Sequence, residues 1–284
     1  MACPACGGAL GGAVAYPGAA GWRAAGFATA QITFCASCGL GLADPLPSQS
    51  ALDAFYAGGC YWHDLADGAT LAAHARNQCR HRANRARLTL QKRLPGRVLD
   101  VGAGEAWLGD VLRAESYEFV EPDPRARERA AKRLGQRAKA FASLDEVGGG
   151  YELVFVNQVL EHVADPVAFL SGMAARLTVG GVLYLEVPNA DYRFKADVFP
   201  HTLFFTPDSL ARVAARGGLR SLACESFGAL SEHRPAVTRL AGKAALRVGE
   251  LLGATLLAHA GDDLLFDYRE RPDGVWLRWL GRRA

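Results

Sequence analysis

The sequence has no apolar run long enough to cross a lipid bilayer. A membrane helix needs about 20 consecutive apolar residues, but the most apolar segment, residues 240–261, is interrupted by Lys243, Arg247 and Glu250. The N-terminus lacks the charged and then apolar pattern of a secretory leader. A net charge of +3 over 284 residues is too small to indicate nucleic-acid or membrane binding by itself. We therefore expect a soluble, cytoplasmic protein without a transmembrane segment.

Two common nucleotide-binding motifs are also missing. Gly102 and Gly104 follow the apolar run 97–101, but Trp107 stands where the GxGxxG motif of dinucleotide-binding proteins has its third glycine. The GxxxxGK[ST] motif of nucleoside triphosphate hydrolases does not occur. These absences argue against a ligand held mainly through its phosphates.

Cysteine is present in small number and is concentrated near the N-terminus. Four of the seven cysteines form two CxxCG motifs, with Cys3 and Cys6 in the first and Cys35 and Cys38 in the second. Two such turns predict a closed tetrahedral site for structural Zn²⁺ within a zinc ribbon over residues 1–44. Four unrelated buried thiols or a redox pair are the alternatives. The other cysteines are more typical of small apolar core positions.

Residues 45–96 are expected to form a helical arm. No acidic residue occurs between Gly68 and Leu99, whereas this window contains eight cations. Either these cations pair with acidic residues elsewhere, or they form a positive wall for an anionic substrate such as a phosphate, a nucleotide or RNA. The cations of this basic window are Arg76, Arg80, Arg82, Arg85, Arg87, Lys92, Arg93 and Arg97.

Strand and helix patterns alternate regularly from residue 97 onward. Apolar strand segments occur at 97–101, 117–121, 137–141, 151–158, 180–189 and 219–227, separated by helix patterns at 106–114, 122–135, 165–177 and 206–218. Such alternation predicts an α/β fold, a Rossmann-like, doubly wound and mostly parallel sheet over residues 97–284. Ligands of such sheets bind at the carboxyl ends of the strands.

The C-terminal segment adds elements to this core. Residues 239–260 predict an amphipathic helix with Arg239, Lys243 and Arg247 on one stripe. Packing on the core is the first expectation for it, and a lid, a dimer contact or a membrane-surface contact are the alternatives. Residues 262–283 predict two short strands around the turn 271–274, one of which completes the sheet.

Acidic residues beside the glycine turn indicate the type of ligand. Gly102 and Gly104 allow close approach to the backbone, and Glu121, at the end of the next strand segment, suits two ribose hydroxyls. Asp100 is placed to orient a ligand amine directly or through water. A ligand with a ribose, a cationic amine and no phosphates fits this set, and S-adenosylmethionine is such a ligand.

The motifs also resemble a known family. The segments VLDVGAGEAWLGDVL, VEPDP, LVFVNQVLEHVADPVAFL, GGVLYLEVPN and HTLFFTPDSL occur in this order. Together they resemble class I S-adenosylmethionine-dependent methyltransferases over residues 97–228. Ala106 stands where the family often has a third glycine. The zinc ribbon resembles a branch that includes methyltransferases of sugar and natural-product biosynthesis.

This resemblance implies roles for several residues. It implies that Gly102 and Gly104 approach the methionine part of the cofactor and that Glu121 binds its ribose. By the same resemblance, Asn157 and Gln158 lie beside the sulfonium and the methyl acceptor, with capping of the strand end as the alternative. Residues that would flank the adenine are Ser143 and Leu144.

Two histidines near the strand ends are candidates for catalysis. Methyl transfer needs in-line geometry more than acid–base chemistry, and a base is needed only for a hydroxyl or an activated carbon. His201 lies in the segment after the fifth strand, which usually lines the acceptor pocket, and His162 begins a helix. Structural roles are the alternative for both. Tyr56, Tyr61 and Trp62 of the arm could close over the cofactor, with packing against the core as the alternative, and Tyr61 is the candidate for substrate binding.

The leading hypothesis is therefore a methyltransferase that acts on a small anionic or glycosylated acceptor, such as a nucleotide-linked sugar, at oxygen or carbon. One alternative is an RNA methyltransferase that holds RNA with its ribbon and basic window, although the modest net charge disfavours nucleic acid. Another is a cofactor-binding or interaction protein without catalysis. A homodimer is a further prediction for the chain.

Overall fold

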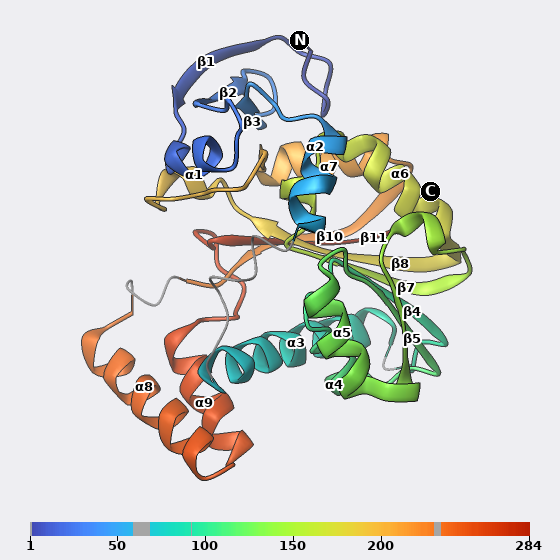
Figure 1. The fold of residues 1–284 in the computed structure, drawn as a ribbon, viewed down its shortest axis with the longest axis vertical. Coiled ribbons are helices and arrows are strands. Elements are labelled where there is room, and N and C mark those ends of the chain that lie inside the picture. The colour runs from blue at the N-terminus through green and yellow to red at the C-terminus, as the bar shows by residue number, and fades with distance from the viewer. Residues whose placement is uncertain (1, 59–68, 92, 230–233) are drawn as a thin grey trace.

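The computed structural model describes residues 2–58, 69–91, 93–229 and 234–284. Figure 1 shows a small N-terminal sheet at one end, a large sheet flanked by helices in the middle, and a protruding pair of helices at the other end. Within the described ranges, no helix combines the length and the apolar character that crossing a bilayer requires.

The large sheet has seven strands and confirms the predicted Rossmann-like architecture. Its strand order is β10-β11-β8-β7-β4-β5-β6. The five strands from β6 to β8 in this order are parallel to one another, whereas β11 is antiparallel to both β8 and β10. The order reverses between β4 and β7, which is where doubly wound sheets open a ligand crevice. The strands are β4 Arg97–Val101, β5 Ser116–Val120, β6 Ala138–Phe141, β7 Tyr151–Asn157, β8 Leu177–Pro188, β10 Leu219–Phe227 and β11 Trp276–Arg283.

Three helices between these strands begin with the same type of N-cap. A capping side chain, Asp123, Asp165 or Thr206, accepts backbone N–H groups of the first turn, and a proline follows it. This arrangement satisfies free N–H groups and fixes the backbone angle of the first helical residue. The helices are α5 Pro124–Leu134, α6 Pro166–Arg176 and α7 Pro207–Arg216. The helix predicted over 106–114 is only a single turn, α4 Leu108–Val111.

The C-terminal predictions are partly wrong. β11 completes the sheet as predicted, but the first of the two expected strands, over 262–270, is instead the end of helix α9 Thr255–Leu265 and a loop. The reason is tertiary: the buried Asp262 carboxylate accepts hydrogen bonds from Asn77 at 2.7 Å and Tyr268 at 2.8 Å, which fastens α9 to helix α3. The helix expected over 239–260 is divided into α8 Ala236–Leu251 and α9, with Gly253 at φ +63° between them.

Helix α3, Ala69–Thr89, connects this helical pair to the sheet (Figure 1). Arg80 and His81 of α3 contact Asp263 of α9 at 3.0 and 2.8 Å. α9 therefore packs on α3, a helix of the predicted arm, whereas packing on the core was the expectation. Several leucines of the pair remain exposed, namely Leu240, Leu251, Leu252 and Leu256.

The N-terminal sheet is continuous with the core. Its order is β1-β2-β3-β9, and β9 Leu203–Phe204 comes from the segment after β8. Trp22 is completely buried, and the centroid of its ring lies 5.0 Å from the ring centroid of Phe199 in that segment. The remaining elements are β1 Leu10–Ala15, α1 Ala19–Ala24, β2 Gln31–Cys35, β3 Gly41–Asp44 and helix α2 Gln49–Ala57.

Candidate functional site

The glycine turn lies at the carboxyl end of β4. Gly102 and Gly104 have φ angles of +65° and +56°, a backbone region that residues with a side chain rarely adopt. A Cβ atom on Gly102 would lie 2.3 Å from Cγ2 of Val159. Packing against Val159 therefore requires glycine at position 102, in addition to any requirement of a ligand.

Glu121 holds this turn from the end of β5. Its carboxylate is buried and accepts the N–H of Gly104 at Oε2 (2.6 Å) and the N–H of Asp123 at Oε1 (2.9 Å). Burial raises the pKa of Glu121 to about 7, although the two hydrogen bonds lower it. Since each carboxylate oxygen accepts more than one hydrogen bond, the same group retains acceptor capacity for two hydroxyls.

Asp100 is directed into the core. It accepts the hydroxyl of Tyr117 at 2.6 Å, and it is 4% exposed. Burial raises the pKa of Asp100 to about 6, while Tyr117 and Arg82 lower it. Its expected role toward a ligand amine stays a prediction.

The ends of β6 and β7 lie at the same edge of the sheet. Asn157 ends β7, and its Oδ1 atom is buried without a hydrogen-bond partner among the described residues. Gln158 has φ +55° and donates its N–H to the Glu186 carbonyl at 2.8 Å. Ser143 caps the short turn that begins with Leu144 after β6. An orphaned amide oxygen and a strained residue beside the glycine turn are typical of a ligand site.

His201 and His162 lie together, with their ring centroids 4.9 Å apart. The Nδ1 atom of His162 lies 2.8 Å from the Tyr56 hydroxyl, and burial together with His201 lowers the pKa of His162 well below its usual value. The Nδ1 atom of His201 lies 3.1 Å from Asp191 Oδ2, and Lys195 Nζ lies 2.9 Å from the same oxygen. Although burial opposes it, these two groups lower the pKa of Asp191.

Glu161 is fully buried beside the two histidines. Neither of its carboxylate oxygens has a hydrogen-bond partner in the described part of the chain. Burial raises the pKa of Glu161 to about 8. Ligand atoms of Glu161, His162 and His201 lie within 4.8 Å of one another, so the three residues have the chemistry of a metal-ligand set.

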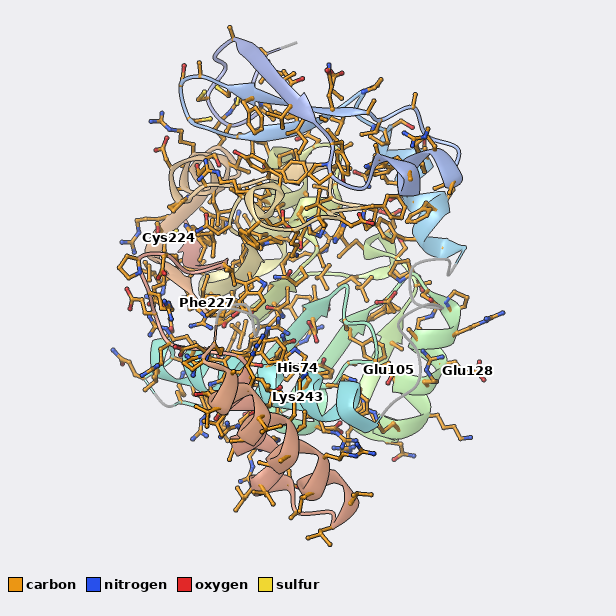
Figure 2. All side chains as sticks on the ribbon, turned by 90° about the vertical axis from the view of Figure 1, so that its left-hand side faces the viewer. His74, Glu105, Glu128, Cys224, Phe227 and Lys243 are labelled. Atoms are coloured by element: carbon orange, nitrogen blue, oxygen red, sulfur yellow. The ribbon has the colours of Figure 1, made fainter. Side chains whose placement is uncertain are left out.

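A cavity of about 230 Å³ opens beside β8 and β11. Gln158 is the one predicted cofactor residue that lines it, and Arg82 reaches it from the basic window; His162 and His201 do not line it. Figure 2 places Phe227 in the region where the sheet meets the C-terminal helices. The described lining residues are Gln78, His81, Arg82, Gln158, Glu186, Phe227, Tyr268, Trp276 and Arg278.

Most of these cavity residues were not predicted from the sequence. A signal exists in the two apolar strands, where one buried acid and one buried arginine interrupt the runs: Glu186 in β8 and Arg278 in β11. The two residues are cross-strand partners. Tyr61, predicted to bind substrate, lies outside the described residues.

The basic window is mostly paired with acids, as the first of the two interpretations expected. Its arginines at 80, 82, 85, 93 and 97 form ion pairs with Asp263, Glu186, Glu225, Glu152 and Glu118. Arg76 stacks instead over the Trp107 ring, 4.4 Å from its centroid.

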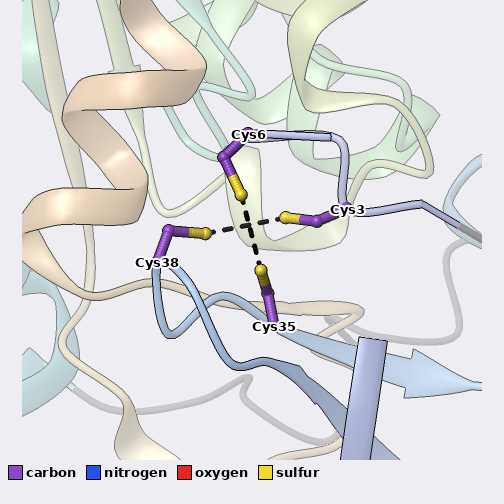
Figure 3. A group of neighbouring side chains, drawn as sticks. All are labelled: Cys3, Cys6, Cys35 and Cys38. Carbon is purple, nitrogen blue, oxygen red and sulfur yellow. Dashed lines mark hydrogen bonds between the residues drawn. The ribbon is translucent and has the colours of Figure 1, made fainter. Parts of the chain in front are cut away.

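The four N-terminal cysteines converge on one point (Figure 3). The Sγ atoms of Cys3 and Cys38 are 3.6 Å apart, and those of Cys6 and Cys35 are 3.4 Å apart. Tetrahedral Zn²⁺ with Zn–S bonds of about 2.3 Å separates its sulfur ligands by about 3.8 Å. Although burial raises it, backbone N–H groups and the neighbouring thiols lower the pKa of Cys35 to about 6, whereas burial raises the pKa values of Cys3 and Cys38. The four residues therefore suit a thiolate-bound metal.

Comparisons with known proteins agree with this geometry. A family model described as a methyltransferase domain matches residues 71–223. A ubiquinone biosynthesis O-methyltransferase of Nitrobacter winogradskyi is 29% identical over 147 residues, which are 43% of this chain and 56% of that protein. The protein of the same description from Xanthomonas campestris pv. campestris is 32% identical over 152 residues, 50% of this chain and 62% of that protein. The chain thus spans less than two thirds of these relatives.

Solved structures share the fold. An S-adenosylmethionine-dependent methyltransferase of Thermotoga maritima aligns with a TM-score of 0.53 and 15% identity, covering 83% of this chain and 99% of that one. A chain from a complex of a methyltransferase activator and a methyltransferase of Haloferax volcanii aligns with a TM-score of 0.53 and 16% identity, covering 82% and 97%.

The fold is therefore that of the S-adenosylmethionine-dependent methyltransferase with which the chain aligns. This chain belongs to the methyltransferase-domain family, whose model covers more than half of its residues.

Proposed function

We propose that the protein transfers the methyl group of S-adenosylmethionine to a small anionic acceptor, at oxygen or at an activated carbon. The observation that carries this proposal is the buried Glu121 carboxylate at the tip of β5, which is hydrogen-bonded to the Gly104 turn. A separate cavity beside β8 and β11 contains two arginines, which suits an anionic acceptor. The printed description of the curated relatives, O-methyltransferase, favours oxygen.

In this proposal the chain's own residues position the cofactor. The buried acceptor oxygens of Glu121 hold its ribose, and the turn at Gly102 and Gly104 admits its methionine part. The unpaired Oδ1 of Asn157 supports a polar contact at the end of β7, and Leu144 would flank the adenine. When bound, S-adenosylmethionine supplies a methyl group on a positively charged sulfur. The acceptor atom that would receive this methyl group would have to lose a proton.

We assign the removal of that proton to His201. Asp191 lies 3.1 Å from Nδ1 of His201 and would hold the ring so that Nε2 accepts the proton. Burial and the neighbouring His201 lower the pKa of His162, which favours the neutral form of the His162 ring. A neutral His162 beside His201 would support this orientation. Because neither histidine lines the cavity, this assignment depends on the acceptor reaching past Gln158.

We further propose that the N-terminal unit, residues 1–44, binds one structural Zn²⁺ through Cys3, Cys6, Cys35 and Cys38. The four sulfur donors occupy all positions of a closed tetrahedral site, so this metal would stabilise the ribbon and take no part in the reaction. In this division of the chain, residues 45–96 form the arm and residues 97–284 the catalytic core. A homodimer and a cytoplasmic location stay predictions.

An acceptor screen scored by release of S-adenosylhomocysteine tests the proposed function. We expect turnover with small anionic acceptors and none with tRNA or rRNA fragments. Preference for RNA would support the alternative RNA methyltransferase. Binding of S-adenosylhomocysteine without turnover on any acceptor class would support a cofactor-binding protein without catalysis.

A further inference from the structure

The cavity lies on the acceptor side of the proposed cofactor turn. β8 and β11 are on the side of β7 away from β4 and β5, and Gln158, directly after β7, forms part of the cavity wall. Neighbouring strands are about 4.8 Å apart, so Glu186 on β8 lies about 10 Å from β4. A cofactor over β4 and β5 would therefore leave this cavity to another molecule.

The cavity has an excess of positive charge. Nε of Arg82 lies 2.7 Å from Glu186 Oε2, and Nε of Arg278 lies 3.0 Å from Glu186 Oε1. The Tyr184 hydroxyl also donates to Glu186 Oε1 at 2.6 Å. Two guanidinium groups thus share one carboxylate, and among the described lining residues no other carboxylate is present. The side chains of Arg82 and Arg278 are 14% and 7% exposed, and a poorly solvated cation favours an anionic partner.

The neighbouring acids do not cancel this charge. Glu225, outside the cavity lining, forms an ion pair with Arg85 and lies 3.7 Å from Arg278 Nη1. His81 is held by Asp263 at 2.8 Å. The surplus charge at the cavity is therefore that of one guanidinium, which matches a single carboxylate and can form paired N–H···O bonds with it.

The walls of the cavity are flat. The rings of Phe227 and Trp276 lie 5.9 Å apart at an angle of 36°, and the Arg278 guanidinium lies 3.9 Å from the centroid of the Phe227 ring. On another side, Tyr268 stacks on His81 at 4.2 Å and 20°. Aromatic faces favour a planar ligand. A volume of about 230 Å³ is below the roughly 300–1,000 Å³ of sites for drug-sized ligands, so the cavity suits one ring and is too small for a nucleotide-linked sugar.

We propose that the cavity binds the methyl acceptor and that this acceptor is a single planar ring with one carboxylate, which the Arg82 guanidinium recognises. That the ligand is the methyl acceptor rests on the proposed function. The preference of the cavity for a planar ring with a carboxylate can be measured without methyl transfer.

Three probes of similar size separate charge from planarity: benzoate, its neutral amide benzamide, and the non-planar anion cyclohexanecarboxylate. Calorimetry with the full chain, with and without saturating S-adenosylhomocysteine, measures their affinities. We expect benzoate to bind at least tenfold more tightly than either other probe and more tightly than UDP-glucose. Equal affinity for benzoate and benzamide, or stronger binding of UDP-glucose, overturns the inference while leaving the affinity for S-adenosylhomocysteine as a separate test of the proposed function.

Two variants locate the recognition. Arg82→Gln leaves Glu186 with Arg278 and Tyr184 as partners, and we expect it to weaken benzoate at least tenfold without changing the affinity for benzamide or S-adenosylhomocysteine. The matched control is Arg87→Gln, an exposed arginine on the same helix. Trp276→Leu should remove the preference for benzoate over cyclohexanecarboxylate. If Arg82→Gln instead weakens S-adenosylhomocysteine and spares benzoate, Arg82 binds the cofactor carboxylate and the inference is overturned.

Discussion

The N–H of Gly104 donates to Oε2 of Glu121 across 2.6 Å, which joins the turn after β4 to the end of β5. Substituting Glu121 by Ala therefore removes both a support of the turn and the proposed ribose acceptor. A lost charge-assisted contact costs on the order of 1.5–3 kcal/mol, at least tenfold in affinity. We expect calorimetry to show this loss for S-adenosylhomocysteine with Glu121→Ala, and none with Glu128→Gln, an exposed acid on the neighbouring helix α5 (Figure 2). Equal binding by wild type and Glu121→Ala would remove the ribose assignment.

Features that depend on short-range chemistry were predictable from the sequence. The Asp-Pro caps of α5 and α6 and the apolar runs of β4, β7 and β8 locate these elements within a few residues. The convergence of four cysteines follows in the same way from two local CxxCG turns.

Features that depend on partners distant in the chain were not predictable. The segment around Asp262 has a strand-like pattern, but buried hydrogen bonds to Asn77 and Tyr268 hold it in a helix and loop. The cavity arises only when β11 inserts antiparallel beside β8, which brings Arg278 opposite Glu186. Neither pairing has a local signature, because the residues are separated by 185 positions in one case and 92 in the other.

Zinc content tests the ribbon. We expect elemental analysis to find about one zinc per chain, because four thiolates at tetrahedral separations bind Zn²⁺ in preference to harder metal ions such as Mg²⁺ or Ca²⁺. Cys3→Ser or Cys35→Ser should release the metal and lower the stability of the N-terminal unit, while S-adenosylhomocysteine still binds. Cys224→Ser, at an exposed cysteine in β10, is the control and should keep the metal. Finding no metal in the wild type, or finding the four cysteines oxidised to disulfides, would contradict the prediction.

Glu161 makes stability depend on pH. Burial raises its pKa in the folded protein to about 8, above the ordinary value of 4.5, so folding favours the protonated acid. The contribution of protonated Glu161 to the free energy of unfolding is complete below pH 4.5 and is lost as the pH rises through 8. Each unit of pKa displacement corresponds to about 1.4 kcal/mol. Since Glu161→Gln has no charge to bury, urea unfolding should show it gaining at least about 1 kcal/mol over wild type between pH 5 and pH 8. Glu128→Gln should follow wild type throughout. Parallel curves for Glu161→Gln and wild type would contradict the prediction, because they would show that Glu161 ionises in the folded protein as readily as in the unfolded chain.

Substitutions at His201 and Asp191 separate catalysis from positioning. If His201 takes the acceptor proton, His201→Ala should lower turnover by roughly 10² to 10⁴ with the affinity for S-adenosylhomocysteine unchanged. Asp191→Asn keeps the size of the side chain but removes the charge 3.1 Å from Nδ1 of His201, so we expect a smaller loss of kcat than for His201→Ala, with little change in KM. His259→Ala, on α9, is the control for loss of a histidine elsewhere. Steady-state kinetics with the best acceptor of the screen measures all three variants. An undiminished His201→Ala enzyme would mean that His201 does not take the acceptor proton, and an unchanged kcat of Asp191→Asn would mean that the carboxylate does not position the His201 ring.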